Sequence, residues 1–307
     1  MSHLNDTLWV WREHKIKLPE LMADGKPWPK ISIVTPSYNQ GQYIEETIRS
    51  VIMQGYPNLE YIVIDGGSTD NSVEIIKKYE KDISWWVSEK DKGQTHAINK
   101  GFEKATGDIV AYLNSDDVLM PYSFRVVAEL MMRWDINWLT GIRSHLNPSG
   151  SISTVKKSPR AFNRFLYSKG FNLSGFLGFN QQVSTFWRRS LTKDIKWNET
   201  LNCCMDIDIW LQLSKTTELF SVSSILGLMR QHKEQKSKTV CTGLREIESR
   251  YDIYNLYSSK IRNVLYFLML TPGIRSLLRI FWCDGKGKTI TWSVQKNDWI
   301  MEVKTVY

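Results

Sequence analysis

The sequence contains few cysteines. Its 307 residues include only Cys203, Cys204, Cys241 and Cys283, and none of these forms a C-x-x-C pair or a zinc-type spacing. This excludes a disulfide-stabilised scaffold and argues against a zinc centre. Because free thiols persist best under reducing conditions, we expect a cytoplasmic protein.

Long apolar stretches are also missing. No run of 18 apolar residues occurs, so we expect no membrane-spanning helix. The beginning, MSHLNDTLWVWREHK, is polar and lacks the apolar segment of a signal peptide.

Two nucleotide-related signatures are absent. No G-x-G-x-x-G follows the first apolar strand, which argues against a nucleotide-dependent oxidoreductase. The formal net charge is +8, but the basic residues are scattered and no nucleic-acid-binding motif accompanies them. We therefore expect anionic partners such as nucleotides, phosphorylated acceptors or membrane surfaces, and no nucleic acid.

The pattern that is present alternates strands with helices. Apolar, β-branched segments predict buried strands, and apolar residues at helical spacing, such as Ile44, Ile48 and Val51, predict helices between them. This alternation indicates an α/β fold with a parallel sheet. The expected strands are 31–35, 61–64, 85–88 and 109–113, and the expected helices follow Ile44 and span 72–80 and 94–105. Asn71 and Glu74 stand at capping-box spacing at the start of helix 72–80.

The rest of the chain is less regular. Residues 1–30 form a lead-in arm. Beyond residue 130 we expect strands at 137–143, 183–187 and 219–229, and a helix near 206–215. From residue 243 the pattern is helical and amphipathic.

Polar residues follow three of the expected strands, in the segments 35–39, 65–70 and 114–117. In open parallel sheets the ligand lies beyond the carboxyl ends of the strands. The sequence therefore predicts a binding site at this edge of the sheet.

The pair Asp116-Asp117 is the strongest chemical signal. Adjacent carboxylates repel one another unless a cation or hydrogen bonds offset their charge, and Mg²⁺ or Mn²⁺ often links carboxylates to a substrate diphosphate. The alternative is a solvated turn in which Asp117 caps the next helix. The position after a third parallel-type strand favours the metal site.

Other polar groups have two interpretations. At its strand end Asp65 favours a ligand role, whereas Asp70 fits a helix cap slightly better. The pair Arg188-Arg189 fits a phosphate contact or a solvated strand end equally well.

An acidic helix start contains Asp206 and Asp208. Two positions apart on a helix, they point roughly 200° apart and cannot share a role, so one suits a general base and the other a cap or a solvated position on the helix. His232 lies in a basic stretch with Arg230, Lys236 and Ser237, where a diphosphate or metal contact is credible.

Four segments resemble family 2 glycosyltransferases. ISIVTPSYNQGQYIEETIRSVIMQGYPNLEYIVIDGGSTDNS resembles their nucleotide-binding half and GDIVAYLNSDD their metal-binding motif. FNQQVSTFWRRS with MDIDIWL resembles the acceptor half, and MRQHKEQKSKT resembles the segment that closes the catalytic domain. The order and spacing of these segments, over roughly residues 31–240, make the resemblance specific.

The resemblance implies a GT-A fold, which is a Rossmann-like, mostly parallel sheet flanked by helices. It divides the domain into a nucleotide-binding half, 31–117, and an acceptor half, 118–240. It also implies transfer of a sugar, with inversion, from a nucleotide-sugar, most often a UDP-sugar, to an acceptor hydroxyl. The expected acceptor is a glycan or a lipid-linked sugar in polysaccharide assembly.

The resemblance also assigns roles to residues. Asp206 takes the place of the catalytic base, and Asp117 and His232 take the places of metal contacts. Donor contacts are expected from Thr35, Pro36, Tyr38, Asn39, Asp65, Gly66, Asn99, Lys100, Ser115, Asp116, Arg230, Lys236 and Ser237. Two positions depart from the family: Gly66 stands where a second acid often reads the nucleobase, and Met205 stands where Glu often precedes the base.

The segment 241–307 supports two interpretations. A basic amphipathic helix suits peripheral attachment to the inner face of the cell membrane, and a helical hairpin suits packing on the domain or homodimer formation. The basic segment from Lys156 to Lys169 would suit a lipid-diphosphate acceptor. A catalytically inactive nucleotide- or glycan-binding module remains the alternative function, although the presence of Asp116, Asp117 and Asp206 argues against it.

Overall fold

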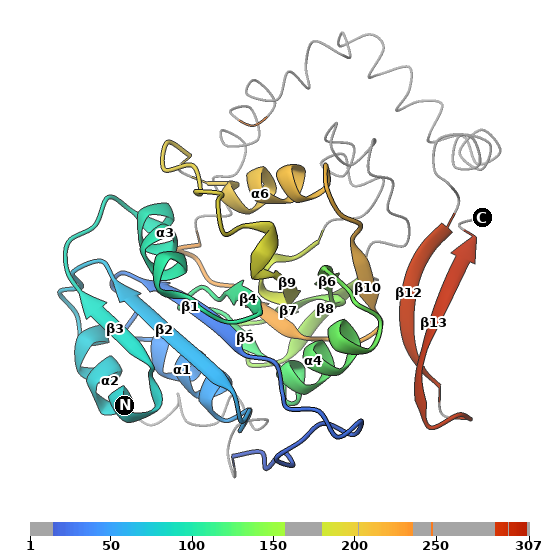
Figure 1. Cartoon of the computed structure of the whole chain (residues 1–307). Coiled ribbons are helices and arrows are strands. Elements are labelled where there is room, and N and C mark those ends of the chain that lie inside the picture. The colour runs from blue at the N-terminus through green and yellow to red at the C-terminus, as the bar shows by residue number, and fades with distance from the viewer. Residues whose placement is uncertain are drawn as a thin grey trace, which may run out of the picture.

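The chain folds around a mixed, mostly parallel sheet (Figure 1). The computed structural model describes residues 15–156, 180–201, 203–235, 247, 286–293 and 295–305. The first elements alternate as the sequence predicts: β1 (Ile31–Ser37), α1 (Ile44–Ile52), β2 (Leu59–Asp65), α2 (Ser72–Lys78), β3 (Trp85–Ser88), α3 (Gln94–Lys104) and β4 (Ile109–Tyr112).

These first four strands are parallel neighbours. β1 pairs with both β2 and β4, and β2 pairs with β3, so the sheet order here is β4-β1-β2-β3. Because all four strands run the same way, their carboxyl ends meet at one edge. The polar segments that follow them therefore converge.

The remaining described strands extend this sheet or build a second one. The large sheet continues through β9 (Thr185–Arg188), β6 (Trp138–Thr140), β10 (Phe220–Val222), β12 (Lys286–Ser293) and β13 (Asp298–Thr305). A smaller sheet has the order β5 (Val118–Leu119), β11 (Gly227–Arg230), β7 (Arg143–Leu146) and β8 (Ile152–Lys156).

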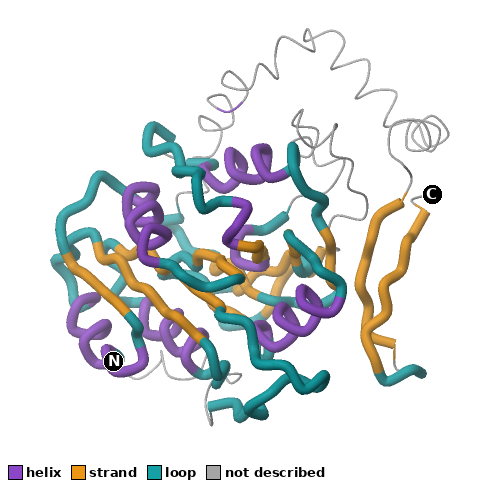
Figure 2. Tube along the Cα trace, viewed as in Figure 1, coloured by secondary structure: helices purple, strands orange, loops and turns teal. Residues whose placement is uncertain are grey.

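Helices cover both faces of the large sheet. Figure 1 shows α3 and α6 (Met205–Leu213) on one side and α1, α2 and α4 (Ser123–Arg133) on the other. The tube view in Figure 2 shows the strands between these helical layers. Short 3₁₀ turns occur at Glu80–Asp82, Gln182–Ser184 and Arg189–Leu191.

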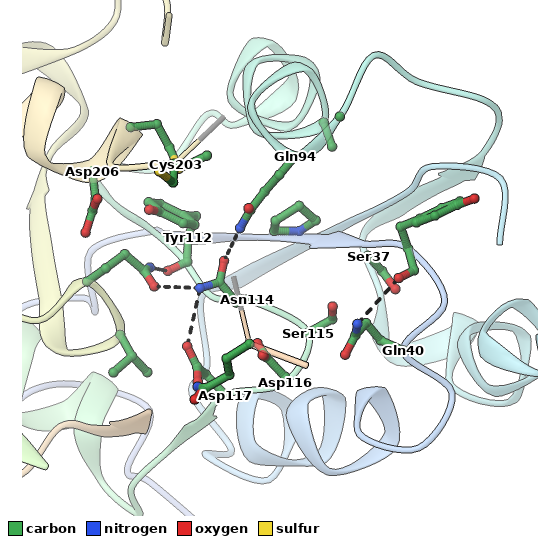
Figure 3. Close-up of a pocket in the computed structure, with 18 of the residues that line it drawn as sticks. Ser37, Gln40, Gln94, Tyr112, Asn114, Ser115, Asp116, Asp117, Cys203 and Asp206 are labelled. Carbon is green, nitrogen blue, oxygen red and sulfur yellow. Dashed lines mark hydrogen bonds between the residues drawn. The ribbon is translucent and has the colours of Figure 1, made fainter. Parts of the chain in front are cut away.

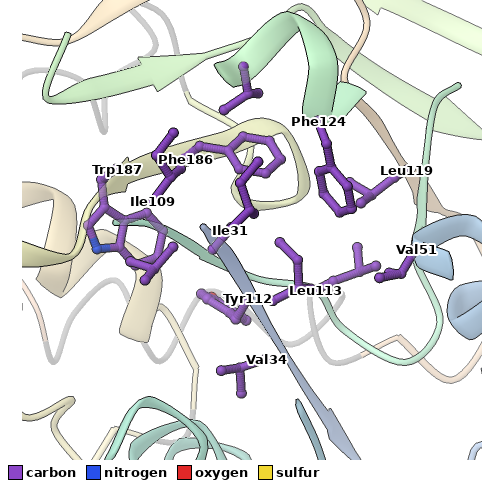
Figure 4. Packing of buried hydrophobic residues seen from close by; sticks show 14 of the residues in the cluster. Ile31, Val34, Val51, Ile109, Tyr112, Leu113, Leu119, Phe124, Phe186 and Trp187 are labelled. Carbon is purple, nitrogen blue, oxygen red and sulfur yellow. The ribbon is translucent and has the colours of Figure 1, made fainter. Parts of the chain in front are cut away.

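The core lies between the strands and the helices (Figure 4). Ile31, Val34 and Ile109 from the central strands are fully buried, as are Val51 of α1 and Phe124 of α4. Burying one such side chain contributes about 1.5–3 kcal/mol. This packing holds the loops at the strand ends in fixed positions.

Two local predictions need correction. Residues 219–229 form two strands, β10 and β11, because the chain leaves the large sheet after Val222 and joins the small one at Gly227. Asn71, which we expected to cap α2 through a capping box, makes no side-chain cap. The carboxylate of Asp70 accepts the Ser72 N–H instead, at 3.0 Å.

The prediction that 241–307 is helical throughout is wrong for residues 286–305. There β12 and β13 pair as an antiparallel hairpin, and β12 pairs with β10 through Ser221↔Thr289 and Val222↔Ile290. Alternation of β-branched or aromatic residues with polar ones, as in Thr289-Ile290-Thr291-Trp292, favours a strand. The hairpin thus extends the catalytic sheet instead of forming a helical appendage.

The prediction of helices in residues 241–285 falls, apart from Ile247, outside the described residues. Apart from Ile247, residues 236–285 lie outside the described residues, as do 1–14 and 157–179. In the described part of the chain, no helix is long and apolar enough to cross a bilayer.

Candidate functional site

A cavity of about 950 Å³ opens at the carboxyl ends of the parallel strands. Its walls come from the loops after β1, β2, β3 and β4, from the start of α6 and from the chain after β11. Eight of the residues given donor, metal or base roles from the sequence line it: Pro36, Tyr38, Gly66, Ser115, Asp116, Asp117, Asp206 and His232. Figure 3 shows Asp116, Asp117 and Asp206 facing this one pocket.

The acidic pair is held from α1 and from β11. The Thr47 hydroxyl of α1 donates to the carbonyl oxygens of Ser115 and Asp117, at 2.9 and 2.7 Å. The backbone N–H of Arg230 donates to Oδ1 of Asp117 at 2.9 Å. Burial, and then the neighbouring Asp116 carboxylate, raise the pKa of Asp117 well above its usual range. A cation at this place would offset both effects.

His232 reaches the same acidic pair from the chain after β11. Its Nε2 lies 2.9 Å from Oδ2 of Asp116, and its ring packs against Tyr43 with the centroids 4.8 Å apart. Arg230 does not line the cavity. Its guanidinium pairs with Glu46 and donates from Nε to the Asp116 carbonyl oxygen at 2.8 Å, so it positions the acidic pair.

The donor atoms at this place suit a hard divalent cation. Oxygen ligands from carboxylates with one imidazole nearby fit Mn²⁺ or Mg²⁺ bound jointly with a diphosphate. Among the described residues, however, no cluster of three or more His, Cys, Asp or Glu side chains is preassembled around a single point. The protein alone would supply only part of the coordination, and a substrate diphosphate or water would complete it.

Asp206 occupies the opposite side of the cavity, in the first turn of α6. Burial raises its pKa from 3.8 to about 6, although its side chain keeps some contact with solvent through the pocket. Asp208 points away, is 1% exposed and accepts a hydrogen bond from Gln212 at 3.0 Å. Of the two acids, Asp206 is the one that lines the pocket. Asp208 is buried rather than solvated, and the role of Asp206 as general base stays a prediction.

A chain of side-chain amides runs along the pocket floor (Figure 3). Nε2 of Gln94 donates to Oδ1 of Asn114 at 2.7 Å. Nδ2 of Asn114 in turn points to Asp117 Oδ2 at 3.4 Å and to Gln182 Oε1 at 3.3 Å. Sequence reasoning did not assign functional roles to Gln94 and Gln182, because an amide has no spacing signature.

Three expected donor contacts are structural in this fold. Both carboxylate oxygens of Asp65 accept hydrogen bonds from nearby residues: from the Ser68 hydroxyl and the Gly67 and Ser68 N–H groups of the loop after β2, and from the Ser88 hydroxyl at the end of β3. Thr35 is fully buried and bonds the Tyr61 hydroxyl at 3.1 Å. Asn39 Oδ1 accepts from the Thr69 N–H at 2.8 Å.

The expected contacts from α3 also lie outside the pocket. Asn99 is buried and joins α3 to the segment that precedes α6, donating to the Trp197 carbonyl and accepting from the Trp197 N–H. Lys100 pairs with Glu89. Both side chains leave the helix on faces turned away from the cavity, which its first turn meets through Gln94. Lys236 and Ser237 lie outside the described residues.

The two open interpretations are resolved by contacts remote from the cavity. Arg188 donates to the Met131 carbonyl and Arg189 to the Gly107 carbonyl, each at 3.1 Å, so neither arginine lies at the pocket. Asp70 acts as the turn and cap residue, accepting from the Gly41 and Ser72 N–H groups.

Several lining residues were not singled out from the sequence. They include Lys90 and Asp91 after β3, Arg143 of β7, the pair Gln181-Gln182, and Cys203 beside Asp206. Burial lowers the pKa of Arg143. These residues reach the pocket through irregular loops or the small sheet, and neither periodicity nor spacing marks them.

Comparison with known proteins agrees with this architecture. Residues 32–195, more than half of the chain, match the family described as Glycosyl transferase family 2, and the chain belongs to this family. A putative teichuronic acid biosynthesis glycosyltransferase, TuaG of Bacillus subtilis, is 40% identical over 107 residues, which cover 34% of this chain and 42% of TuaG.

A more extended match is the poly-beta-1,6-N-acetyl-D-glucosamine synthase of Staphylococcus epidermidis. It is 24% identical over 280 residues, covering 90% of this chain and 62% of that enzyme. The chain thus spans less than two thirds of the length of either relative.

Solved structures share the fold. S. aureus TarS 1-349 in complex with UDP-GlcNAc superposes with a TM-score of 0.55 at 19% identity, over 68% of this chain and 61% of TarS 1-349. The mannosyltransferase PcManGT of Pyrobaculum calidifontis, in complex with GDP-Man and Mn²⁺, gives 0.52 at 16% identity, over 75% and 64%. At these identities the likeness concerns the fold alone, and it confirms the predicted GT-A architecture.

Proposed function

We propose that this chain transfers a sugar, with inversion, from a nucleotide-sugar to an acceptor hydroxyl in polysaccharide assembly. The observation that carries the proposal is the placement of Asp206 and the Asp116-Asp117 pair in one cavity. One side of the cavity then suits a diphosphate and the other suits a general base. Family membership supports the reaction class.

In this mechanism the acceptor hydroxyl attacks the anomeric carbon from the side opposite the nucleotide. Asp206 accepts the hydroxyl proton as the new glycosidic bond forms, while the bond from the anomeric carbon to the diphosphate oxygen breaks. A base with a pKa of about 6 is largely ionised at neutral pH and close enough to neutrality to hold the proton. No covalent intermediate with the protein is needed.

Asp117, with Asp116 and His232 beside it, would hold Mn²⁺ or Mg²⁺. When bound, such an ion offsets the charge that develops on the departing diphosphate. The surrounding residues keep the acidic pair in place: Thr47 fixes the backbone of the loop and Arg230 fixes the Asp117 carboxylate.

The choice of donor and acceptor follows the structural neighbours and the relatives. A structural neighbour binds UDP-GlcNAc and another binds GDP-Man with Mn²⁺, which supports a nucleotide-sugar donor, and a UDP-sugar is our first choice. The names of TuaG and of the poly-beta-1,6-N-acetyl-D-glucosamine synthase support a glycan or lipid-linked acceptor. Arg143 on the pocket wall would suit an anionic group on that acceptor.

We also propose a cytoplasmic enzyme that attaches to the inner membrane surface through residues of the segment 241–307, and we keep homodimer formation as the competing role of that segment. The excess of basic residues there supports attachment to anionic lipid. Flotation with anionic vesicles tests this, since protein that stays unbound would remove the membrane role. Sedimentation of the unbound protein would then test the dimer.

The reaction is tested by release of nucleoside diphosphate from a panel of UDP-, GDP- and dTDP-sugars, with Mn²⁺ or with chelator. We expect release from one donor, in the presence of metal only, and its loss in Asp117→Asn. If no donor releases nucleotide and no nucleotide stabilises the protein against heat, the transferase proposal is wrong and a sugar- or glycan-binding module becomes the better account.

A further inference from the structure

The loop after β3 brings a carboxylate into the donor side of the cavity. Asp91 lines the pocket, three residues beyond the end of β3. Its loop starts against β2, where the Glu89 N–H donates to the Asp65 carbonyl at 3.0 Å. From there the chain passes over Gly66 and Gly67, at the end of the neighbouring strand.

The two glycines make this approach possible. A Cβ atom at position 66 would lie 2.7 Å from Oδ2 of Asp91, and one at position 67 would lie 3.2 Å from the Lys90 nitrogen. Gly67 also has a φ of +83°, which favours glycine. The Asp91 carboxylate therefore fills the space that a side chain at position 66 would take.

Only one oxygen of Asp91 serves its own loop. Oδ1 accepts the Gly93 N–H at 2.7 Å and so fixes the carboxylate ahead of α3. Oδ2 is the oxygen nearest to the Gly66 position, at the pocket wall. A merely structural turn residue would need the first contact but not a place on the cavity wall.

The sheet order places this carboxylate at the far end of a bound nucleotide. The acidic pair follows β4 and Asp91 follows β3, with β1 and β2 between them. Three strand spacings of about 4.8 Å separate the two ends, roughly 14 Å in all. With its diphosphate at the acidic pair, a nucleotide that extends across β1 and β2 would bring its base to the Asp91 carboxylate beside Gly66.

We propose that Asp91 selects the nucleobase of the donor by accepting a hydrogen bond from a ring N–H. This inference rests on the proposed function. An ionised carboxylate only accepts hydrogen bonds. Uracil, thymine and guanine present a ring N–H on their pairing edge, whereas cytosine and adenine present a lone pair at that place. The carboxylate therefore favours the first group and disfavours the second.

The test is equilibrium binding of free nucleoside diphosphates in Mn²⁺, comparing UDP with CDP and GDP with ADP. In the pair that the wild type binds better, we expect the nucleotide with a ring N–H (UDP or GDP) to bind at least about tenfold more tightly than its partner (CDP or ADP). The partner's base would leave the charged Asp91 carboxylate unpaired. In Asp91→Asn the ratio should fall to within about threefold, because an amide can present either a donor or an acceptor.

Two further variants make the result specific. Glu89→Gln makes the same chemical change on the same loop outside the pocket, and should keep the wild-type ratio. Gly66→Ala pushes the Asp91 carboxylate aside without changing its charge, and should lower the ratio as Asp91→Asn does. Binding of a nucleotide with an unchanged ratio in Asp91→Asn overturns the role of Asp91 alone. Failure of the wild type to bind any of the four overturns the proposed function as well.

Discussion

Nε2 of His232 lies 2.9 Å from Oδ2 of Asp116, although 116 positions separate the two residues in the chain. The contact joins the segment after β11 to the loop after β4, and both residues line the pocket. The chain after β11 thereby contributes a residue to the proposed metal site.

Removal of this imidazole should weaken metal-dependent nucleotide binding. Loss of a residue at or beside a metal ligand typically costs about 10–100-fold in metal affinity or activity. We therefore expect His232→Ala to raise the Kd for UDP in Mn²⁺ by about tenfold or more, measured by calorimetry. Lys233→Ala alters the exposed neighbour and serves as the control. Equal affinity in both variants would remove His232 from the site.

The rate of transfer should depend on the ionisation of Asp206. Burial raises the pKa of this carboxyl to about 6, and only the ionised form can accept the acceptor proton. The rate at saturating donor should therefore fall about tenfold for each unit of pH below about 6, and level off above it. A rate that is independent of pH between 5 and 7 would show that Asp206 does not act as the base.

The same carboxyl should cost the protein stability at neutral pH. Because its pKa in the folded state lies above the ordinary value of 3.8, ionisation favours the unfolded chain as pH rises from about 4 to about 6. Asp206→Asn should therefore raise the free energy of unfolding at pH 8 by about 1–3 kcal/mol, measured by urea denaturation. The lower part of this range applies because solvent reaches the side chain. The gain should disappear near pH 4. Destabilisation at pH 8 would contradict this.

Asn99 provides a test that separates the structure from the sequence-based interpretation. The structure gives it a joining role, with three hydrogen bonds of 2.8–2.9 Å to Trp197 and Glu199. Asn99→Ala should lower the free energy of unfolding by about 2–4 kcal/mol, because the Trp197 N–H is left without a partner. Its Kd for nucleotide should stay unchanged. Lys100→Ala, which removes an exposed ion pair, should cost less than about 1 kcal/mol.

The sequence predicts the nucleotide half of the fold well because each of its elements carries a local signal. Strands such as Ile109–Tyr112 are uniformly apolar, and α1 has its apolar residues on one face. Their parallel order then brings Pro36, Gly66 and Asp116 to one edge without any further information.

The rest depends on contacts that are distant in sequence. Asp65 and Asn39 are polar residues at strand ends like Asp116, and only the fold shows that Asp65 accepts from the loop after β2 and that Asn39 accepts from Thr69 of that neighbouring loop. The Asp91 carboxylate, after β3, fits against the chain after β2 because Gly66 has no side chain there, and the sequence does not show that these two segments meet. The hairpin at 286–305 is stabilised by pairing with β10, and no pattern within 286–305 predicts that pairing.

The most direct test of the account compares Asp206→Asn with Asp208→Asn. Both variants change an acid to its amide on the same helix, but only Asp206 faces the pocket. We expect Asp206→Asn to bind the donor as the wild type does and to lose transfer by about 10²–10⁴-fold, the usual contribution of a general base, while Asp208→Asn transfers normally. Transfer by Asp206→Asn at the wild-type rate would contradict the central claim that this pocket carries out the reaction with Asp206 as its base.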